Sequence, residues 1–166
     1  MNIVLIGYRG TGKSTVGRLL AGRLGREFVS TDEEIVKRAR RTIQEIVAQQ
    51  GWEYFRDLES DFCRELGSRD QLIIDTGGGA ILRAQNVEVL KKNGILIWLK
   101  ASVETITKRI GGDNQRPSLT GTKSFVDEIQ DVLRERTPKY QAVADHTIAT
   151  DGLTPHQLTE TLLPLT

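Results

Sequence analysis

The residues best suited to chemistry lie in one glycine-rich segment near the start of the chain, GYRGTGKS at positions 7–14. The segment matches the phosphate-binding loop pattern G-x-x-x-x-G-K-[S/T] without a gap. In this pattern backbone N–H groups surround a phosphate, a lysine reaches the β- and γ-phosphates, and a hydroxyl holds Mg²⁺. The segment therefore predicts binding of a nucleoside triphosphate with Mg²⁺, through Gly10, Thr11, Gly12, Lys13, Ser14 and Thr15.

A second group of residues could handle a phosphoryl acceptor. Asp32 follows an apolar run, where a carboxylate can orient a hydroxyl or accept its proton as an O–P bond forms. Asp32 could equally cap the next helix, and the residues alone leave this choice open. Arg56 lies among apolar side chains, and Arg136 lies near the end of a long helical pattern, where a cation is favourable in any case. Two guanidinium groups together would suit an anionic acceptor, because their planar forks match a carboxylate.

Two glycine-containing segments could shape the space around these groups. Residues 77–79 are three consecutive glycines after an apolar run, so a ligand could approach their backbone closely. Residues 111–123 are polar, with three glycines and one proline, and could be a surface loop or a mobile lid carrying Arg116 onto the phosphates. We favour the lid, because excluding water directs phosphoryl transfer to an acceptor instead of to hydrolysis. In the phosphate loop itself, we expect the side chains of Tyr8 and Arg9 to be solvated.

The elements that must position these groups alternate between strand-like and helical patterns. Short apolar runs predict strands at 2–6, 27–30, 71–75, 95–99 and 146–149. Helical spacing or caps predict helices at 15–24, 31–40, 42–67, 86–92, 102–110 and 124–141, and a last one starting at Thr154 and Pro155. We expect the helix over 124–141 to be interrupted at Pro138. This alternation predicts an α/β fold with a parallel sheet covered by helices on both faces.

The predicted sheet brings the candidate residues together, because ligands in such sheets bind beyond the carboxyl ends of the strands. Residues 30–32, residues 75–79 and the phosphate loop should share that edge. We expect one domain over residues 1–166, with a substrate-binding segment at about 32–60 and the lid at about 111–123.

Composition excludes several other classes of protein. The chain has 23 basic and 22 acidic residues and no dense basic run, which argues against nucleic-acid binding. Cys63 is its single cysteine, so an intramolecular disulfide and a cysteine-rich zinc site are excluded. The sequence shows no signal peptide and no apolar run of membrane-spanning length. We expect a soluble cytoplasmic protein that does not bind membranes, and a monomer.

A phosphate loop alone does not choose among switches, motors and kinases. Guanine-specific switches typically carry an N-K-x-D motif, which this chain lacks, and motors usually need a larger core. A compact chain with a candidate lid favours a kinase for a small acceptor. A kinase for gluconate or a nucleotide and a non-catalytic nucleotide-binding module are the alternatives.

Together with the phosphate loop, Asp32 and four further motifs follow in order and make the whole chain resemble the shikimate kinase family. These four motifs are G-x-x-x-F-R at 51–56, T-G-G-G at 76–79, R-P-x-L at 116–119 and R-x-P-x-Y at 136–140. The resemblance implies a three-layer P-loop kinase fold with a five-stranded parallel sheet in the order 2-3-1-4-5. It also implies ATP-dependent phosphorylation of the 3-hydroxyl of shikimate, with Mg²⁺ as the cofactor.

The resemblance assigns roles to individual residues. Asp32 would bind the reacting hydroxyl and act as a base, while Lys13 and Arg116 would neutralise charge on the phosphoryl group. The substrate carboxylate would be held by Arg56 and Arg136, with the backbone of Gly78 and Gly79 nearby. The adenine would lie between Arg109 and the segment 150–155, which contains Pro155.

One position departs from the family pattern. The family commonly has a second Asp two residues before the substrate Asp, linked to the metal through water. Here that residue is Ser30. We expect Asp75, at the end of the third strand, to orient Mg²⁺-bound water instead, and Ser30 to contribute little. Alternatively, Asp75 only stabilises the glycine turn.

Overall fold

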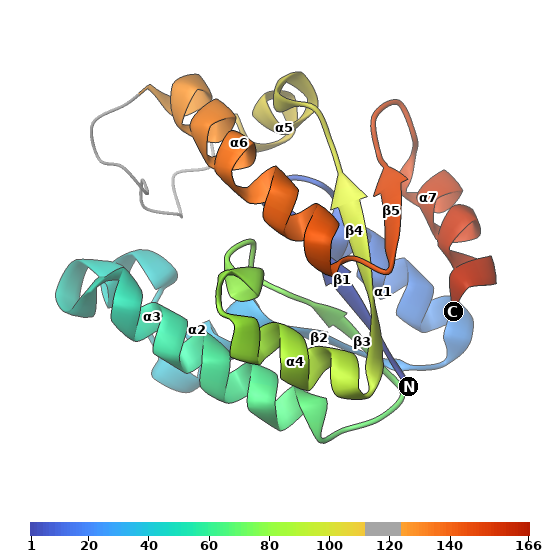
Figure 1. Ribbon diagram of the computed structural model, residues 1–166, viewed down its shortest axis with the longest axis horizontal. Helices are drawn as coiled ribbons and strands as arrows, with labels where there is room; N and C mark the ends of the chain where they lie inside the picture. The colour runs from blue at the N-terminus through green and yellow to red at the C-terminus, as the bar shows by residue number, and fades with distance from the viewer. Residues whose placement is uncertain (112–123) are drawn as a thin grey trace.

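A five-stranded parallel sheet forms the centre of the molecule in a computed structural model, which describes residues 1–111 and 124–166 (Figure 1). The strand order is β2-β3-β1-β4-β5, and every neighbouring pair runs parallel. The strands are β1 (Asn2–Ile6), β2 (Glu27–Ser30), β3 (Leu72–Asp75), β4 (Gly94–Lys100) and β5 (His146–Ala149). The predicted fold class and strand order are therefore confirmed.

Helices cover both faces of the sheet, with α1 and α7 on one face and α3 and α4 on the other (Figure 1). None of the helices in the described part of the chain is long and apolar enough to cross a membrane. The helices are α1 (Lys13–Leu24), α2 (Thr31–Ala39), α3 (Ile43–Gly67), α4 (Ala84–Lys92), α5 (Val103–Ile110), α6 (Phe125–Val143) and α7 (Pro155–Leu162), with short 3₁₀ turns η1 (Ala80–Leu82) and η2 (Leu163–Leu165).

Alternation along β1 shows how the sheet builds two cores. Val4 and Ile6 face the cluster that includes side chains of α3, α4 and α6, whereas Ile3 and Leu5 face the cluster formed with α1 and α7. All four side chains are at most 1% exposed. Full burial of one such side chain contributes about 1.5–3 kcal/mol, so the strand that leads into the phosphate loop is firmly anchored.

The helix starts follow side-chain caps. The N-cap of α2 is Ser30, whose hydroxyl accepts from the backbone N–H of Glu33 at 3.4 Å. Asp32 therefore lies in the first turn of α2 and is not its cap, while its role toward a phosphoryl acceptor stays a prediction. Thr154 caps α7 through a capping box, and Pro155 occupies the first turn as expected.

Two helices differ from the predictions in detail. The helix α3 contains a break at Gly51, where φ is 82° and ψ is 168°, so the chain bends just before Arg56. The helix α6 runs through Pro138 to Val143, and the predicted interruption at Pro138 is wrong. The proline removes one backbone donor, but the next turn is held because Tyr140 is fully buried in the core.

Candidate active site

The carboxyl ends of β1, β2 and β3 bring several of the predicted residues to one cavity. This cavity has a volume of 510 Å³ and contains residues from the phosphate loop, the start of α2 and the turn after β3. Its lining includes Gly10, Gly12, Lys13, Ser14, Asp32 and Gly78. The predicted meeting of three loops at one edge of the sheet is therefore observed.

The phosphate loop has the backbone shape that its glycines permit. Gly10 and Gly12 have φ angles of 77° and 97°, a region that other residues rarely adopt. The helix α1 starts at Lys13 directly after the loop, so its free N–H groups and dipole favour an anion there. The ammonium group of Lys13 donates to the carbonyls of Gly7 at 2.9 Å and Tyr8 at 3.0 Å, which keeps it at the loop.

Ser14 and Asp75 form the pair of oxygen groups next to the loop. The Ser14 hydroxyl donates to Oδ2 of Asp75 at 2.5 Å. Burial raises the pKa of Asp75, and the positive charge of Lys13 opposes this effect. Hydroxyl and carboxylate oxygens are ligands that Mg²⁺ prefers alongside water and phosphate, so the two residues fit this ion. Ser30 is instead engaged in capping α2.

The glycine turn after β3 lies directly against two carboxylates. A Cβ atom on Gly77 would come within 2.4 Å of Glu59 Oε1 and 2.8 Å of Asp32 Oδ1. The backbone N–H of Gly77 donates to the hydroxyl of Thr31 at 2.9 Å, which ties the turn to α2. Position 77 therefore has no room for a side chain, and the turn is fixed next to Asp32.

Both predicted arginines reach the same turn. A Cβ atom on Gly79 would lie 2.3 Å from the Cζ atom of Arg56, and one on Gly78 would lie 3.5 Å from Nη1 of Arg136. The side chain of Arg56 is only 13% exposed, and Arg136 is 8% exposed. The two guanidinium groups, which are about 80 residues apart in the sequence, thus converge on residues 78 and 79.

Glu59 was not among the predicted site residues, although it holds Arg56 in place. Its carboxylate is fully buried and accepts from Nη1 of Arg56 at 3.0 Å. Burial raises the pKa of Glu59, and the neighbouring guanidinium opposes this effect. The signal for this pair was the i, i+3 spacing of Arg56 and Glu59 on one helix.

Tyr140 was also missed as a support of the turn. Its hydroxyl donates to the carbonyl of Gly78 at 2.5 Å, and its ring stacks on Trp98. Burial raises the pKa of Tyr140 to about 12, so the hydroxyl stays protonated and can donate. The motif R-x-P-x-Y contained this residue, but nothing in the spacing indicated its partner.

Arg109 joins the phosphate loop to the segment before α7. Its Nη1 atom donates to the carbonyl of Gly10 at 3.2 Å and to the hydroxyl of Thr150 at 3.1 Å. Asp151 holds the same segment to the first turn of α5 by accepting from the backbone and hydroxyl of Ser102. Arg109 and Thr150, at the start of the predicted adenine segment, therefore lie next to the loop. Arg116 and the predicted lid, from residue 112 to residue 123, lie outside the described residues.

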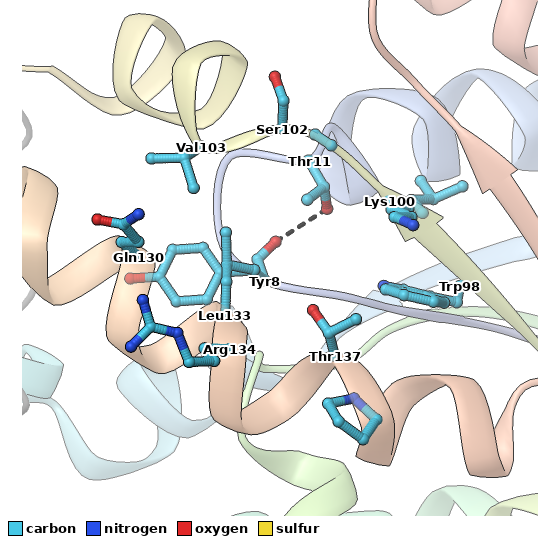
Figure 2. A pocket seen from close by; sticks show the side chains of 13 residues that line it. Tyr8, Thr11, Trp98, Lys100, Ser102, Val103, Gln130, Leu133, Arg134 and Thr137 are labelled. Carbon is cyan, nitrogen blue, oxygen red and sulfur yellow. Dashed lines mark hydrogen bonds between the residues drawn. The ribbon is translucent and has the colours of Figure 1, made fainter.

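A second cavity of 460 Å³ lies between the phosphate loop, the end of β4 and helix α6, and Figure 2 shows it from close by. Tyr8, Thr11, Trp98 and Leu133 contribute to its walls, but Lys13, Asp32 and the glycine turn do not. Tyr8 is only 3% exposed and packs with apolar residues of α5 and α6. The expectation that Tyr8 is solvated is wrong, because its ring anchors the loop in a small core.

Comparison with known proteins gives a consistent result. The family model described as "Shikimate kinase" matches residues 9–165. The shikimate kinase of Nitratidesulfovibrio vulgaris is 45% identical over 153 residues, which cover 90% of this chain and 87% of that protein. The shikimate kinase of Persephonella marina is 42% identical over 163 residues, which cover 98% of this chain and 96% of that protein.

Solved structures agree with the sequence comparisons. The shikimate kinase from Acinetobacter baumannii, solved in complex with shikimate, superposes with a TM-score of 0.94 at 41% identity, and the match covers 99% of this chain and 91% of that one. A gluconokinase from Sinorhizobium meliloti has a TM-score of 0.62 at 18% identity, with coverage of 98% of this chain and 89% of that one, and shares the fold alone. The chain belongs to the shikimate kinase family of ATP-dependent kinases.

Proposed function

We propose that this protein transfers the γ-phosphoryl group of ATP to the 3-hydroxyl of shikimate, releasing shikimate 3-phosphate and ADP. The observation that carries the proposal is the convergence of Asp32, Arg56 and Arg136 on one glycine turn beside the phosphate loop. Membership in the family supports the same acceptor.

The acceptor is held by the two buried guanidinium groups. Arg56 and Arg136 bind the shikimate carboxylate, for which their planar forks are suited. Gly78 and Gly79 leave the backbone open to the ring. A side chain on Gly79 would occupy the space of Arg56, and a Cβ atom on Gly78 would already contact Arg136 at 3.5 Å. Glu59 keeps Arg56 in position through the ion pair at 3.0 Å.

Phosphoryl transfer then needs one acid and several cations. The 3-hydroxyl oxygen forms a bond to the γ-phosphorus, the bond from that phosphorus to the β,γ-bridging oxygen breaks, and the hydroxyl proton passes to Asp32. Lys13 and Arg116 neutralise the negative charge on the phosphoryl oxygens. Positioning and charge stabilisation supply most of the rate enhancement in reactions of this class.

The nucleotide and metal have matching positions. Ser14 and Asp75 would hold Mg²⁺, with Asp75 acting through bound water, and the ion would screen charge on the β- and γ-phosphates. The residues Gly10, Thr11, Gly12 and Thr15 surround the phosphates. Arg109 and Pro155 flank the adenine, which the bonds from Arg109 to the adjoining segment support. A monomeric state and a cytoplasmic location stay predictions.

A panel of acceptors tests the proposed function. The purified protein should form ADP from MgATP with shikimate and should form much less with gluconate or nucleoside monophosphates. Phosphorus NMR of the product should show one new phosphate monoester on the ring. Equal turnover with gluconate or a nucleotide, or no turnover with shikimate, would contradict the proposal.

A further inference from the structure

Arg9, the third residue of the phosphate loop, has a side chain that the site described above leaves without a role. It is partly buried and contributes to the lining of the same 510 Å³ cavity as Lys13, Asp32 and Gly78. Its Nη1 atom is buried and has no hydrogen-bond partner within residues 1–111 and 124–166. The expectation that Arg9 is solvated therefore does not hold for its Nη1 atom.

A buried guanidinium N–H without a partner is unfavourable, because the group has lost its water and gained nothing in return. Such an atom in a ligand cavity indicates that a ligand oxygen completes its bonding. Arginine is well suited to phosphoryl oxygens, which its rigid fork can bind in pairs.

The position of Arg9 favours a phosphoryl group over the substrate carboxylate. Arg9 shares its cavity with the loop residues Lys13 and Ser14, whereas Arg56 and Arg136 do not line that cavity. The carboxylate end of the acceptor is already assigned to those two arginines at the glycine turn. Arg9 therefore lines a cavity that it shares both with the phosphate-loop residues and with Asp32.

We propose that Arg9 is a further catalytic residue, which binds the phosphoryl group during its transfer and then holds the phosphate of the product. The inference rests on the proposed function and adds a residue to it. The Arg9 guanidinium binds equatorial oxygens of the γ-phosphoryl group, on which negative charge is spread in the transition state. Because the same oxygens belong to shikimate 3-phosphate after transfer, Arg9 distinguishes the product from the substrate.

A purely structural role is the competing explanation. The Cζ atom of Arg9 lies 5.8 Å from the ring centroid of Phe125, at the start of α6, so the side chain could simply pack the loop against that helix. Such a contact is weak at a partly exposed site, and it leaves Nη1 without a hydrogen-bond acceptor. Replacing Phe125 tests this explanation separately.

The experiment compares Arg9→Met, Arg9→Lys and Phe125→Leu with the wild type. Arg23→Met serves as the matched control, since Arg23 pairs with Glu160 on the surface at 2.7 Å and does not line the cavity. Calorimetry in the presence of MgADP gives the Kd for shikimate and for shikimate 3-phosphate, and steady-state assays give kcat and KM.

Arg9→Met loses one charge-assisted contact, which is made only with the phosphoryl group. The variant should bind shikimate 3-phosphate at least about 10-fold more weakly than the wild type. Its kcat should be lower by a factor of at least about 10 as well. The Kd for shikimate should stay within about two-fold, and Arg9→Lys should recover part of both losses. Phe125→Leu and Arg23→Met should change each quantity less than about two-fold.

Three results would overturn the inference: unchanged product affinity in Arg9→Met, equal weakening of shikimate and its 3-phosphate, or the same losses in Phe125→Leu. These outcomes are separable from failure of the proposed function. That failure would appear as a wild-type protein that does not phosphorylate shikimate at all.

Discussion

Replacing Gly79 by alanine tests how the glycine turn controls substrate binding. A methyl group on Gly79 would lie 2.3 Å from Cζ and Nη2 of Arg56 and 2.4 Å from Nη1. Nonbonded carbon atoms prefer separations of about 3.5–4.0 Å, so the guanidinium must move by about 1 Å or more. The φ angle of Gly79 is −98°, which alanine adopts easily, and the effect therefore comes from the contact and not from backbone strain.

Moving the Arg56 guanidinium disturbs its contacts with Glu59 and with the substrate. Arg56 cannot move freely, because its Nη1 atom forms an ion pair with the buried carboxylate of Glu59 at 3.0 Å. A shift of this size would misalign the guanidinium of Arg56 and weaken its hydrogen bonds to the substrate carboxylate. Hydrogen bonds to charged groups contribute about 1.5–3 kcal/mol, so the Kd for shikimate should rise by about 10- to 150-fold.

Calorimetric titration with shikimate, with and without MgADP, measures this change, and the KM for ATP serves as an internal reference. The matched control is Gly22→Ala in α1, because a Cβ atom there meets nothing within 4 Å. The control should bind shikimate normally and gain roughly 0.5–1 kcal/mol of stability from the helical alanine. If Gly79→Ala folds and binds shikimate within two-fold of the wild type, the proposed contact of Arg56 with the carboxylate is refuted.

Three further predictions follow from the site. Asp32→Asn should lower kcat by about 10²–10⁴-fold, because the variant loses the proton acceptor. The Kd for MgADP should stay within a few-fold, because the phosphate loop is unchanged. A full rate in this variant would exclude Asp32 as the base. Asp75→Asn should raise the Mg²⁺ concentration needed for half-maximal activity, and Ser30→Ala should not; impairment of the serine variant alone would reverse this assignment. Hydrogen bonds from the first turn of α5 lower the pKa of Asp151 to about 2. The ionised carboxylate stabilises the folded state above about pH 4, and this stabilisation is lost as the pH falls toward 2. Asp151→Asn lacks this titration. In acid unfolding curves the free energy of unfolding of the variant should therefore fall by roughly 1 kcal/mol less between pH 4 and pH 2 than that of the wild type, after allowance for solvent exposure.

Much of the fold could be predicted because local patterns determine it. The strands at 27–30 and 146–149 were placed with the observed bounds, since short apolar runs between turn residues leave few alternatives. The break at Gly51 was not predicted, because the apolar spacing continues across it and only the φ angle of 82° shows the bend. The end of α6 was not predicted correctly, because the burial of Tyr140 keeps the chain helical beyond Pro138 despite the tendency of proline to interrupt a helix.

Site residues could be predicted where a sequence motif indicates the local backbone conformation. Site residues that depend on contacts between distant segments could be predicted less well. The phosphate loop and Asp32 follow strands directly, so the topology brings them to one edge. Glu59 and the Gly78–Tyr140 hydrogen bond depend on packing between α3, the turn after β3 and α6, which no local pattern reports. The burial of the Arg9 Nη1 atom is of the same kind, since it depends on tertiary contacts around the cavity.

The central claim is that two buried arginines select an anionic ring acid beside the phosphate loop. Comparing shikimate with its methyl ester tests this most directly, because the ester keeps every hydroxyl group and lacks the negative charge. We predict that the wild-type kcat/KM for shikimate exceeds that for the ester by at least about 100-fold, and that Arg136→Met reduces this ratio below about 10. Equal kcat/KM values for the acid and the ester in the wild type would contradict the account.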